Sequence, residues 1–248
     1  ANSCTSTQTF NITQPTALSI TPASQTNVSC NGSSNGAASI NTPTGGAGGY
    51  TYNWTPGNPT GDGTTSVTGL TAGTWTCTVT DANTCSKSQT FTITQPTAIS
   101  STTVVTNVSC NGGSNGAINL TPTGGTPGYT FNWGGGVTTE DRTGLIAGSY
   151  TYTITDANGC TNISSVSVTE PSAIATTTSI TNILCNGGST GSATLTSSGG
   201  TSPYTYLWNN GSTTTFQINQ PLGTYSVMVT DSHGCWDSAT AIILSPPA

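Results

Sequence analysis

A six-residue segment that recurs along the chain constrains the fold more than any other feature of this sequence. It begins with Thr-Asp, ends with Cys and occupies 80–85, 155–160 and 230–235, so its cysteines lie 75 residues apart. A second segment, which ends in Cys-Asn-Gly, occupies 28–32, 108–112 and 183–187. Self-similarity at a long, nearly fixed period indicates tandem copies of one structural unit. The sequence therefore predicts a row of small repeats.

The two segments divide the chain into three complete repeats that follow a leading fragment. Residues 1–15 correspond to the terminal strand of a preceding, truncated repeat. The complete repeats are expected at 16–96, 97–171 and 172–248. The first is longer because of a Pro- and Gly-rich insertion around 55–63, a composition typical of loops. Since the fragment begins inside a unit, we expect this chain to be part of a longer array.

Each repeat is expected to consist of β-strands, because its apolar residues alternate with threonine and other polar residues. In 129–133, the aromatic residues at 129, 131 and 133 share one face at the strand period of two. Residues 147–156 alternate in the same way, with Tyr152 and Ile154 inward. About seven short strands in each ~75-residue repeat are typical of an immunoglobulin-like sandwich. We therefore predict an all-β chain without helices, made of tandem immunoglobulin-like β-sandwich domains in an extended rod.

Composition excludes two classes of protein. The chain has two basic residues, Lys87 and Arg142, and a net charge of -6, whereas nucleic-acid binding requires several Lys or Arg to neutralise phosphates. Its longest aliphatic run, 241–244, is far shorter than the ~20 apolar residues of a membrane-spanning helix. The eight cysteines lack the spacing of a metal site and indicate disulfides formed in an oxidising compartment. We expect a secreted or cell-surface protein that binds no nucleic acid and does not span a membrane.

No catalytic centre is predicted. The only histidine, His233, stands in the hairpin turn, where a turn residue is more typical than a general base. The recurrent acids Asp81, Asp156 and Asp231 are copies of one turn position, and an active site copied in every repeat is unusual. These three residues are weak candidates for calcium, since Ca²⁺ requires about six to eight oxygen ligands and each repeat supplies too few acids. We expect no enzyme activity, no metal and no cofactor.

Two pairing schemes fit the spacing of the cysteines. Pairing within repeats joins Cys30–Cys85, Cys110–Cys160 and Cys185–Cys235, whereas pairing across repeat boundaries joins Cys4–Cys30, Cys85–Cys110 and Cys160–Cys185. Each scheme leaves two cysteines over, so counting does not choose between them. We favour the first because the units of an array must fold independently, and a disulfide that closes a ~50-residue loop stabilises by up to about 4 kcal/mol. Cys77 is then a buried thiol and Cys4 an orphan, with a Cys4–Cys77 bond as the remaining alternative.

Three ordered motifs in each unit resemble the SprB repeat. In the second repeat they are Cys-Asn-Gly-Gly-Ser-Asn-Gly at 110–116, Gly-Gly-Thr-Pro-Gly-Tyr-Thr-Phe-Asn-Trp at 124–133, and Ala-Gly-Ser-Tyr to Asp-Ala-Asn-Gly-Cys within 147–160. The late strand is also similar to that of PKD domains, which implies a PKD-like sandwich. SprB repeats occur in very long surface adhesins of gliding Bacteroidota that are exported by type IX secretion. The resemblance therefore implies cell adhesion and gliding motility as the context of this chain.

These observations together predict a structural repeat segment of a secreted cell-surface adhesin or extracellular filament, which acts as a stalk or spacer and as an adhesive surface. Its expected partners are neighbouring repeats, filament subunits and surface glycans. The alternative is an array of carbohydrate-binding modules, or of ice-binding modules that use rows of threonine. Ice binding requires those rows to lie flat, and the twist of a sheet opposes this.

The tryptophans fall into two groups. Trp54, Trp133 and Trp208 each share a strand face with two other aromatic residues, so we expect them in the core rather than as sugar-stacking platforms. Trp236 follows the last hairpin cysteine and is expected to point outward as a contact for a partner. Nearby, Ser238 lies in an Asp-Ser-Ala sequence that resembles the O-glycosylation site of such bacteria.

Overall fold

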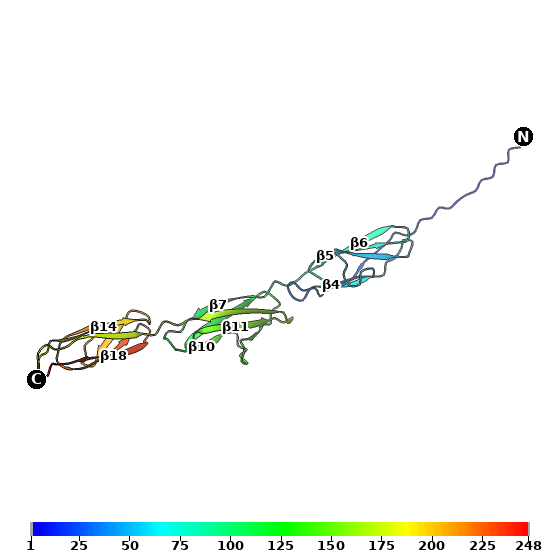
Figure 1. Cartoon of the computed structure of the whole chain (residues 1–248). Coiled ribbons are helices and arrows are strands. Elements are labelled where there is room, and N and C mark those ends of the chain that lie inside the picture. The colour runs from blue at the N-terminus through cyan, green and yellow to red at the C-terminus, as the bar shows by residue number, and fades with distance from the viewer. Residues whose placement is uncertain (1, 248) are drawn as a thin grey trace. The chain divides into compact units, whose positions relative to one another are not determined.

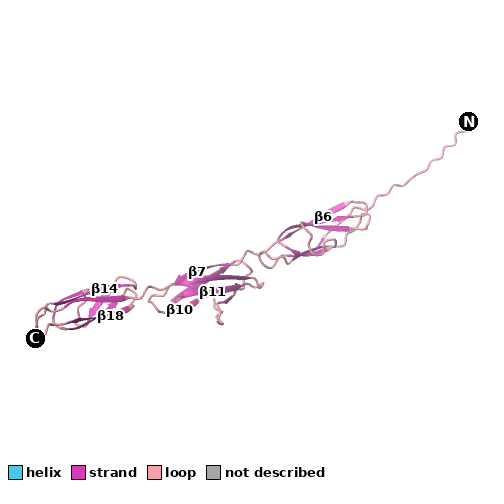
Figure 2. Cartoon of the chain, in the orientation of Figure 1, coloured by secondary structure: helices cyan, strands magenta, loops and turns pink. Residues whose placement is uncertain are grey.

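A computed structural model describes residues 2–247 of the chain (Figure 1). Ala1 and Ala248, the outermost residues of the first and last predicted segments, lie outside the described residues. Across 2–247 the regular structure consists of strands connected by loops and turns, without a helix (Figure 2). The prediction of an all-β fold is confirmed.

The strands follow the same order in each repeat. The first repeat contains β1 (Pro22–Thr26), β2 (Gly36–Ile40), β3 (Thr51–Thr55), β4 (Ser66–Leu70), β5 (Gly73–Thr80) and β6 (Ser86–Ile93). The second contains β7 (Ser100–Thr106), β8 (Gly116–Thr123), β9 (Thr130–Asn132), β10 (Arg142–Leu145), β11 (Gly148–Thr155) and β12 (Thr161–Val168). The third contains β13 (Ala175–Thr181), β14 (Gly191–Ser198), β15 (Thr205–Trp208), β16 (Phe216–Gln220), β17 (Gly223–Thr230) and β18 (Trp236–Ile243).

Each repeat arranges its strands in two three-stranded sheets. In the first repeat the strand orders are β1-β2-β4 and β3-β5-β6, and the other repeats follow the same plan. The pairs β2–β4, β3–β5 and β5–β6 are antiparallel. The count is therefore six strands per repeat rather than the seven expected. The strands predicted around 129–133 and 147–156 are confirmed as β9 and β11, whereas β10 was not predicted.

Both sheets of a repeat contribute to one hydrophobic core, as a β-sandwich requires. In the first repeat, Val67 of β4 and Val79 of β5 are fully buried in the same cluster, together with Trp54 of β3. The third repeat has an equivalent cluster that includes Leu195 of β14 and Val227 of β17. These two clusters consist of residues from within the respective repeat, so each sandwich builds its interior from its own side chains.

The predicted core tryptophans are buried. Trp54 and Trp208 are 0% and 1% exposed and Trp133 is 9% exposed, so the prediction that they are core residues is confirmed. Each indole Nε1 donates a hydrogen bond to a backbone carbonyl of the following loop, which satisfies its polar group in the interior. The acceptors are the carbonyl oxygens of Thr64 (2.9 Å), Thr139 (2.8 Å) and Thr214 (2.8 Å) for Trp54, Trp133 and Trp208 respectively.

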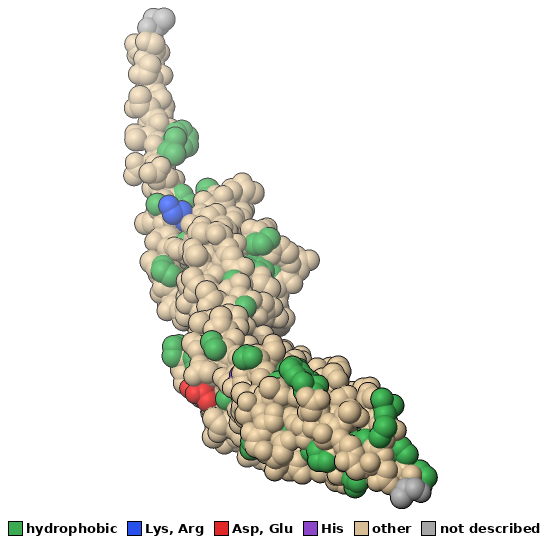
Figure 3. All heavy atoms as spheres, turned by 90° about the vertical axis from the view of Figure 1, so that its left-hand side faces the viewer, with side chains coloured by type: hydrophobic (Ala, Val, Ile, Leu, Met, Phe, Trp, Pro, Cys, Tyr) green, Lys and Arg blue, Asp and Glu red, His purple; other side chains and the backbone are tan. Residues whose placement is uncertain are grey.

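The backbone contacts group the chain into two compact units, which do not coincide with the repeats. Unit 1 contains the residues up to Ser100 together with Thr123–Tyr129 and Thr155–Thr161, a turn and a hairpin of the second repeat. Unit 2 contains Ser101–Pro122, Thr130–Ile154 and the residues from Asn162 onward. The face drawn in Figure 3 is almost entirely uncharged, in keeping with the 4% of charged residues in the chain.

Candidate functional site

The hairpin that carries the recurrent aspartate and cysteine is the first part of the site. In the second repeat, Asp156 Oδ1 accepts hydrogen bonds from the backbone N–H groups of Asn158 (2.9 Å) and Cys160 (2.8 Å). Its Oδ2 accepts one from the backbone N–H of Thr126 (2.8 Å). One buried carboxylate thus holds the hairpin in shape and ties it to a neighbouring turn. The backbone of Cys160 is fixed as a consequence.

The same arrangement recurs in the other two repeats. Asp81 binds the backbone N–H groups of Asn83, Cys85 and Ala47, and Asp231 binds those of His233, Cys235 and Thr201. The pKa of Asp81 and that of Asp156 lie below the usual value, chiefly because of the bonds from Ala47 and Thr126. Burial raises the pKa of Asp231, but its three amide donors and nearby His233 outweigh this and leave it below the usual value.

The loop that contains Cys-Asn-Gly is the second part of the site. The backbone N–H of Gly113 donates to the carbonyl of Cys110 (3.0 Å), which closes a tight turn, and Gly112 adopts a positive φ of 71° within it. The backbone N–H of Gly112 also donates to Glu170 Oε2 (2.7 Å) at the end of the same repeat. The equivalent bonds in the first repeat join Ser33 N to Cys30 O (3.1 Å) and Gly32 N to Gln95 Oε1 (2.7 Å).

Sequence reasoning missed the role of Glu170 and Gln95, which hold the cysteine loop against the exit of its own repeat. The sequence pattern that could have revealed this role is a Gln or Glu that recurs directly before proline at the end of a repeat, in Gln14-Pro15, Gln95-Pro96 and Glu170-Pro171.

The structure corrects the predicted disulfides. Cys30 is bonded to Cys160, and Cys110 is bonded to Cys235, with Cα–Cα distances of 5.6 and 5.5 Å. Neither the pairing within repeats (Cys30–Cys85, Cys110–Cys160, Cys185–Cys235) nor the pairing across boundaries (Cys4–Cys30, Cys85–Cys110, Cys160–Cys185) is present among the described residues. Instead, the loop cysteine of one repeat is joined to the hairpin cysteine of the next repeat.

The length of the last strand explains why pairing within a repeat is wrong. In the first repeat, Cys85 directly precedes β6, whereas the Cys30 loop is anchored to Gln95, just after the end of β6. Eight residues of strand at ~3.3 Å each separate these two points by ~25 Å. A disulfide requires a Cα–Cα distance below about 7 Å, so the two cysteines of one sandwich are far beyond reach.

The remaining cysteines are free thiols. Cys4, Cys85 and Cys185 are exposed, and Cys77 is buried in the core of the first repeat. Burial, with a smaller contribution from the charge of Asp62, raises the pKa of the Cys77 thiol to about 11.

The two segments that the Cys30–Cys160 bond joins also contact each other through polar groups. Asn158 of the hairpin donates from Nδ2 to the carbonyl oxygen of Ser29, the residue before the loop cysteine, at 3.1 Å. The Sγ atom of Cys160 lies 3.4 Å from the same oxygen. In unit 2, the Sγ atom of Cys235 lies 3.3 Å from the carbonyl oxygen of Ser109 in the same way. The loop backbone and the hairpin therefore contact each other beyond the sulfur atoms.

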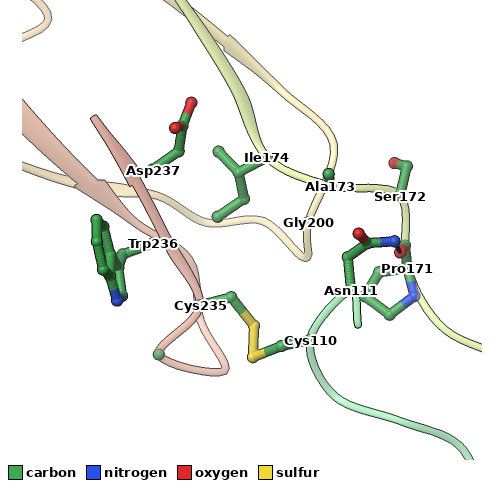
Figure 4. A pocket seen from close by; sticks show the side chains of 11 residues that line it. Cys110, Asn111, Pro171, Ser172, Ala173, Ile174, Gly200, Cys235, Trp236 and Asp237 are labelled. Atoms are coloured by element: carbon green, nitrogen blue, oxygen red, sulfur yellow. Dashed lines mark hydrogen bonds between the residues drawn. A yellow bond between two sulfur atoms is a disulfide. The ribbon is translucent and has the colours of Figure 1, made fainter. Parts of the chain in front are cut away.

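A pocket of about 370 Å³ surrounds the disulfide in unit 2 (Figure 4). The close-up shows Cys110 and Cys235 joined across two segments, with Trp236 on one side and Asn111 and Pro171 on the other. Ile174 of the third repeat forms part of the apolar wall.

Trp236 is exposed, as expected, with 68% of its surface accessible. It lies on the outer face of its sheet with Leu207 and Met228, next to a shallow groove of about 320 Å³ that Ser238 also lines. The positions that match Trp236 in the other repeats hold Ser86 and Thr161, so this apolar group belongs to the third repeat alone. Ser238 is exposed on β18, and its glycosylation stays a prediction.

Most of the acids that could serve catalysis or calcium binding accept hydrogen bonds from the backbone. Besides the three hairpin aspartates, Asp62 accepts from the N–H of Trp54 (2.8 Å), and Asp141 from that of Leu120 (2.9 Å). Within residues 2–247, three or more His, Cys, Asp or Glu residues do not gather at any point in a way that could hold a metal ion. The same part of the chain contains no helix that could cross a membrane.

Comparisons with known proteins agree with the repeat pattern. The family model described as "SprB repeat" matches at 23–59, 102–138 and 177–213, once in each repeat. A search of curated proteins gave no match. Similar solved structures include Sidekick-1 immunoglobulin domains 1-5, at 12% identity and a TM-score of 0.42, covering 94% of this chain and 59% of that chain. Another is surface layer protein SbsC, domains 4-9, at 15% identity and a TM-score of 0.27, covering 94% of this chain and 48% of that chain. The three matches to one family model, one in each of three copies of the same sandwich, show that each repeat contains a segment similar to the SprB repeat.

Proposed function

We propose that this chain is a structural segment of a secreted cell-surface adhesin or extracellular filament, in which it acts as a stalk that transmits tension. The observation that carries the proposal is the pairing of cysteines between consecutive repeats. Cys30 and Cys160 belong to the first and second repeats, and Cys110 and Cys235 to the second and third. Consecutive repeats are thus joined by two covalent connections, the peptide chain and a disulfide.

The order of the cysteines supports a mechanical role. The two disulfides interleave along the sequence, since Cys110 lies between Cys30 and Cys160, and Cys160 lies between Cys110 and Cys235. In the extended chain, the shortest covalent path between the two disulfides is therefore the segment between Cys110 and Cys160, and the peptide that connects the repeats stays slack. The second repeat can therefore lengthen under tension only by the slack of the segment between Cys110 and Cys160.

The repeats at 16–96, 97–171 and 172–248 are the domains of this stalk in our proposal. The first and third contain their own hydrophobic clusters, which supports independent folding of the units. The structural disulfides favour an oxidising, extracellular location. The scarcity of Lys and Arg leaves few sites for trypsin-like proteases, which suits an exposed fibre. The similarity of a segment in each repeat to the SprB repeat supports an adhesin of gliding bacteria exported by type IX secretion as the context.

Solution scattering of the oxidised chain tests the stalk. We expect a rod-like profile whose maximum dimension is the same at low and high salt, because so few charges act along the chain. A profile typical of a compact globule, or a dimension that changes strongly with salt, contradicts the proposal.

Glycan binding is the second candidate function, and the apolar group at Trp236, Leu207 and Met228 favours it. An exposed indole beside hydroxyl groups is suited to stacking on a sugar ring. The test is a glycan array probed with the chain and with Trp236→Ser, which restores the residue type of the first repeat. Binding that the substitution abolishes supports a glycan site, and no binding by either protein rejects it.

A further inference from the structure

We infer that Cys85 and Cys185 are the two halves of a further disulfide of the same kind, which joins the third repeat of one chain to the first repeat of a second copy. The inference rests on the proposed function and deepens it, because it names the partner that the two ends of the segment recognise. Both cysteines are exposed free thiols. They stand at the positions that form a disulfide elsewhere in the chain, Cys85 as a hairpin cysteine and Cys185 as a loop cysteine.

The hairpin of Cys85 has the same backbone geometry as the two hairpins whose cysteines are bonded. The backbone N–H of Cys85 donates to Asp81 Oδ1 at 2.9 Å, compared with 2.8 Å for Cys160 and 3.0 Å for Cys235 at their aspartates. Thr84 adopts the positive φ, 66°, that glycine supplies in the bonded hairpins. Cys85 is thus held in the conformation of a bonded cysteine.

The surroundings of Cys85 also match those of a bonded hairpin cysteine. A pocket of about 370 Å³ adjoins Cys85. Cys110 and Asn111 of the preceding repeat line the pocket at Cys235 in addition to the residues of the third repeat. The matching wall residues are Pro15, Ala17, Leu18, Gly46 and Cys85 in one pocket, and Pro171, Ala173, Ile174, Gly200 and Cys235 in the other. The surface beside Cys85 therefore has the form that receives a Cys-Asn-Gly loop in unit 2.

The Cys185 loop has the conformation of the two bonded loops. The backbone N–H of Gly188 donates to the carbonyl of Cys185 at 3.0 Å, the same distance as between Gly113 and Cys110. Gly187 has a φ of 74°, compared with 71° at Gly112. The residue before Cys185 is Leu184, whose backbone carbonyl stands at the position that receives Asn158 in the first link. Asn83 at the matching hairpin position retains the amide that makes this contact.

The other two free cysteines do not lie in a loop or hairpin of this geometry. Cys77 is buried in the core. Cys4 is exposed on an extended segment outside the strands. Geometry therefore favours Cys85 over Cys4 as the partner of Cys185.

Oxidised glutathione can drive the link by thiol–disulfide exchange. The Cys185 thiolate attacks oxidised glutathione, forms a mixed disulfide and releases one glutathione thiolate. The Cys85 thiolate of the second copy then attacks the Cys185 sulfur, forms the Cys85–Cys185 bond and releases the second glutathione. Two protein thiols are oxidised to one disulfide while one oxidised glutathione is reduced to two thiols, so electrons and protons balance.

Two complementary variants test the link in the full chain. Both carry Cys4→Ser, and one adds Cys85→Ser while the other adds Cys185→Ser, so each retains one half of the link. After incubation in a glutathione redox buffer, we expect a covalent dimer on a non-reducing gel from the mixture, and only background from each variant alone. Mass spectrometry of the dimer should identify a Cys85–Cys185 peptide, with both internal disulfides intact.

Dimer at equal amounts in the mixture and in either variant alone would overturn the inference, as would a mixture that stays monomeric. A variant that carries only Cys85→Ser, and so retains Cys4 and Cys185, is the matched control. It tests whether any exposed thiol crosslinks to Cys185 as well as Cys85 does. Crosslinking of Cys4 to Cys185 as efficient as that of Cys85 to Cys185 would also overturn it. Failure here is distinct from failure of the stalk, because scattering of the monomer reports the stalk without any contact between copies.

Discussion

Reduction of the two disulfides should greatly increase the length to which the chain can be pulled. With both bonds intact, the shortest covalent path runs to Cys30, crosses to Cys160, returns to Cys110, crosses to Cys235 and continues to the C-terminus. That path contains about 90 backbone steps in place of about 250, which at ~3.5 Å per residue gives about 320 Å in place of about 870 Å. The bonds thus withhold about 550 Å of extension.

Single-molecule force spectroscopy with handles at the two termini measures this difference. We expect full unfolding of the oxidised chain to reach about 320 Å, and of the reduced chain about 870 Å. Cys30→Ser removes the first bond alone, so its path has about 120 steps and a length of about 430 Å. Cys110→Ser should give a similar length, because it leaves only the first bond.

Cys85→Ser is the control that can refute the reasoning. Cys85 is free in the structure, so its replacement should leave the oxidised length unchanged. Pairing within repeats would give the same oxidised length of about 320 Å, but there Cys85→Ser would release about 55 residues, or about 190 Å. An increase of that size would show that Cys30 is bonded to Cys85 and would remove the basis for the stalk.

Three further predictions concern stability and reactivity. The pKa of Asp156 in the folded state lies below its unfolded value of about 3.9, so the ionised carboxylate stabilises the fold above that value and this stabilisation is lost as pH falls through the folded pKa. The midpoint temperature of thermal unfolding should therefore decrease below about pH 4. The decrease should be smaller in Asp156→Asn. An equal drop in both proteins would contradict this assignment. Trp208→Ala should lower the free energy of unfolding by about 3–5 kcal/mol in urea titrations, whereas Trp236→Ala should change it by less than about 0.5 kcal/mol. Comparable losses would mean that Trp236 packs in the fold. Alkylation at pH 8, followed by mass spectrometry, should modify Cys77 at least about 100-fold more slowly than Cys85, because burial holds the Cys77 thiol protonated; similar rates would place it at the surface.

Local features of the sequence predicted the elements of each repeat. The alternation around Trp133 and Ile154 defines strands with one buried face, because side chains of a strand point to opposite sides at a period of two. The Asp-Ala-Asn-Gly segment predicts the hairpin for a similarly local reason. The strand β10 was missed because Leu145 is its only buried residue and Gly144 interrupts the alternation.

The cysteine partners depended on tertiary structure. Counting could not choose a pairing, because the separation of the cysteines along the sequence does not reveal which of them lie close together in space. Only the folded sandwich reveals that its strands carry the loop cysteine and the hairpin cysteine to opposite ends, ~25 Å apart, so that each must find its partner in another repeat. The recurring residues determined what each repeat is, and the length of its strands decided how one repeat is bonded to the next.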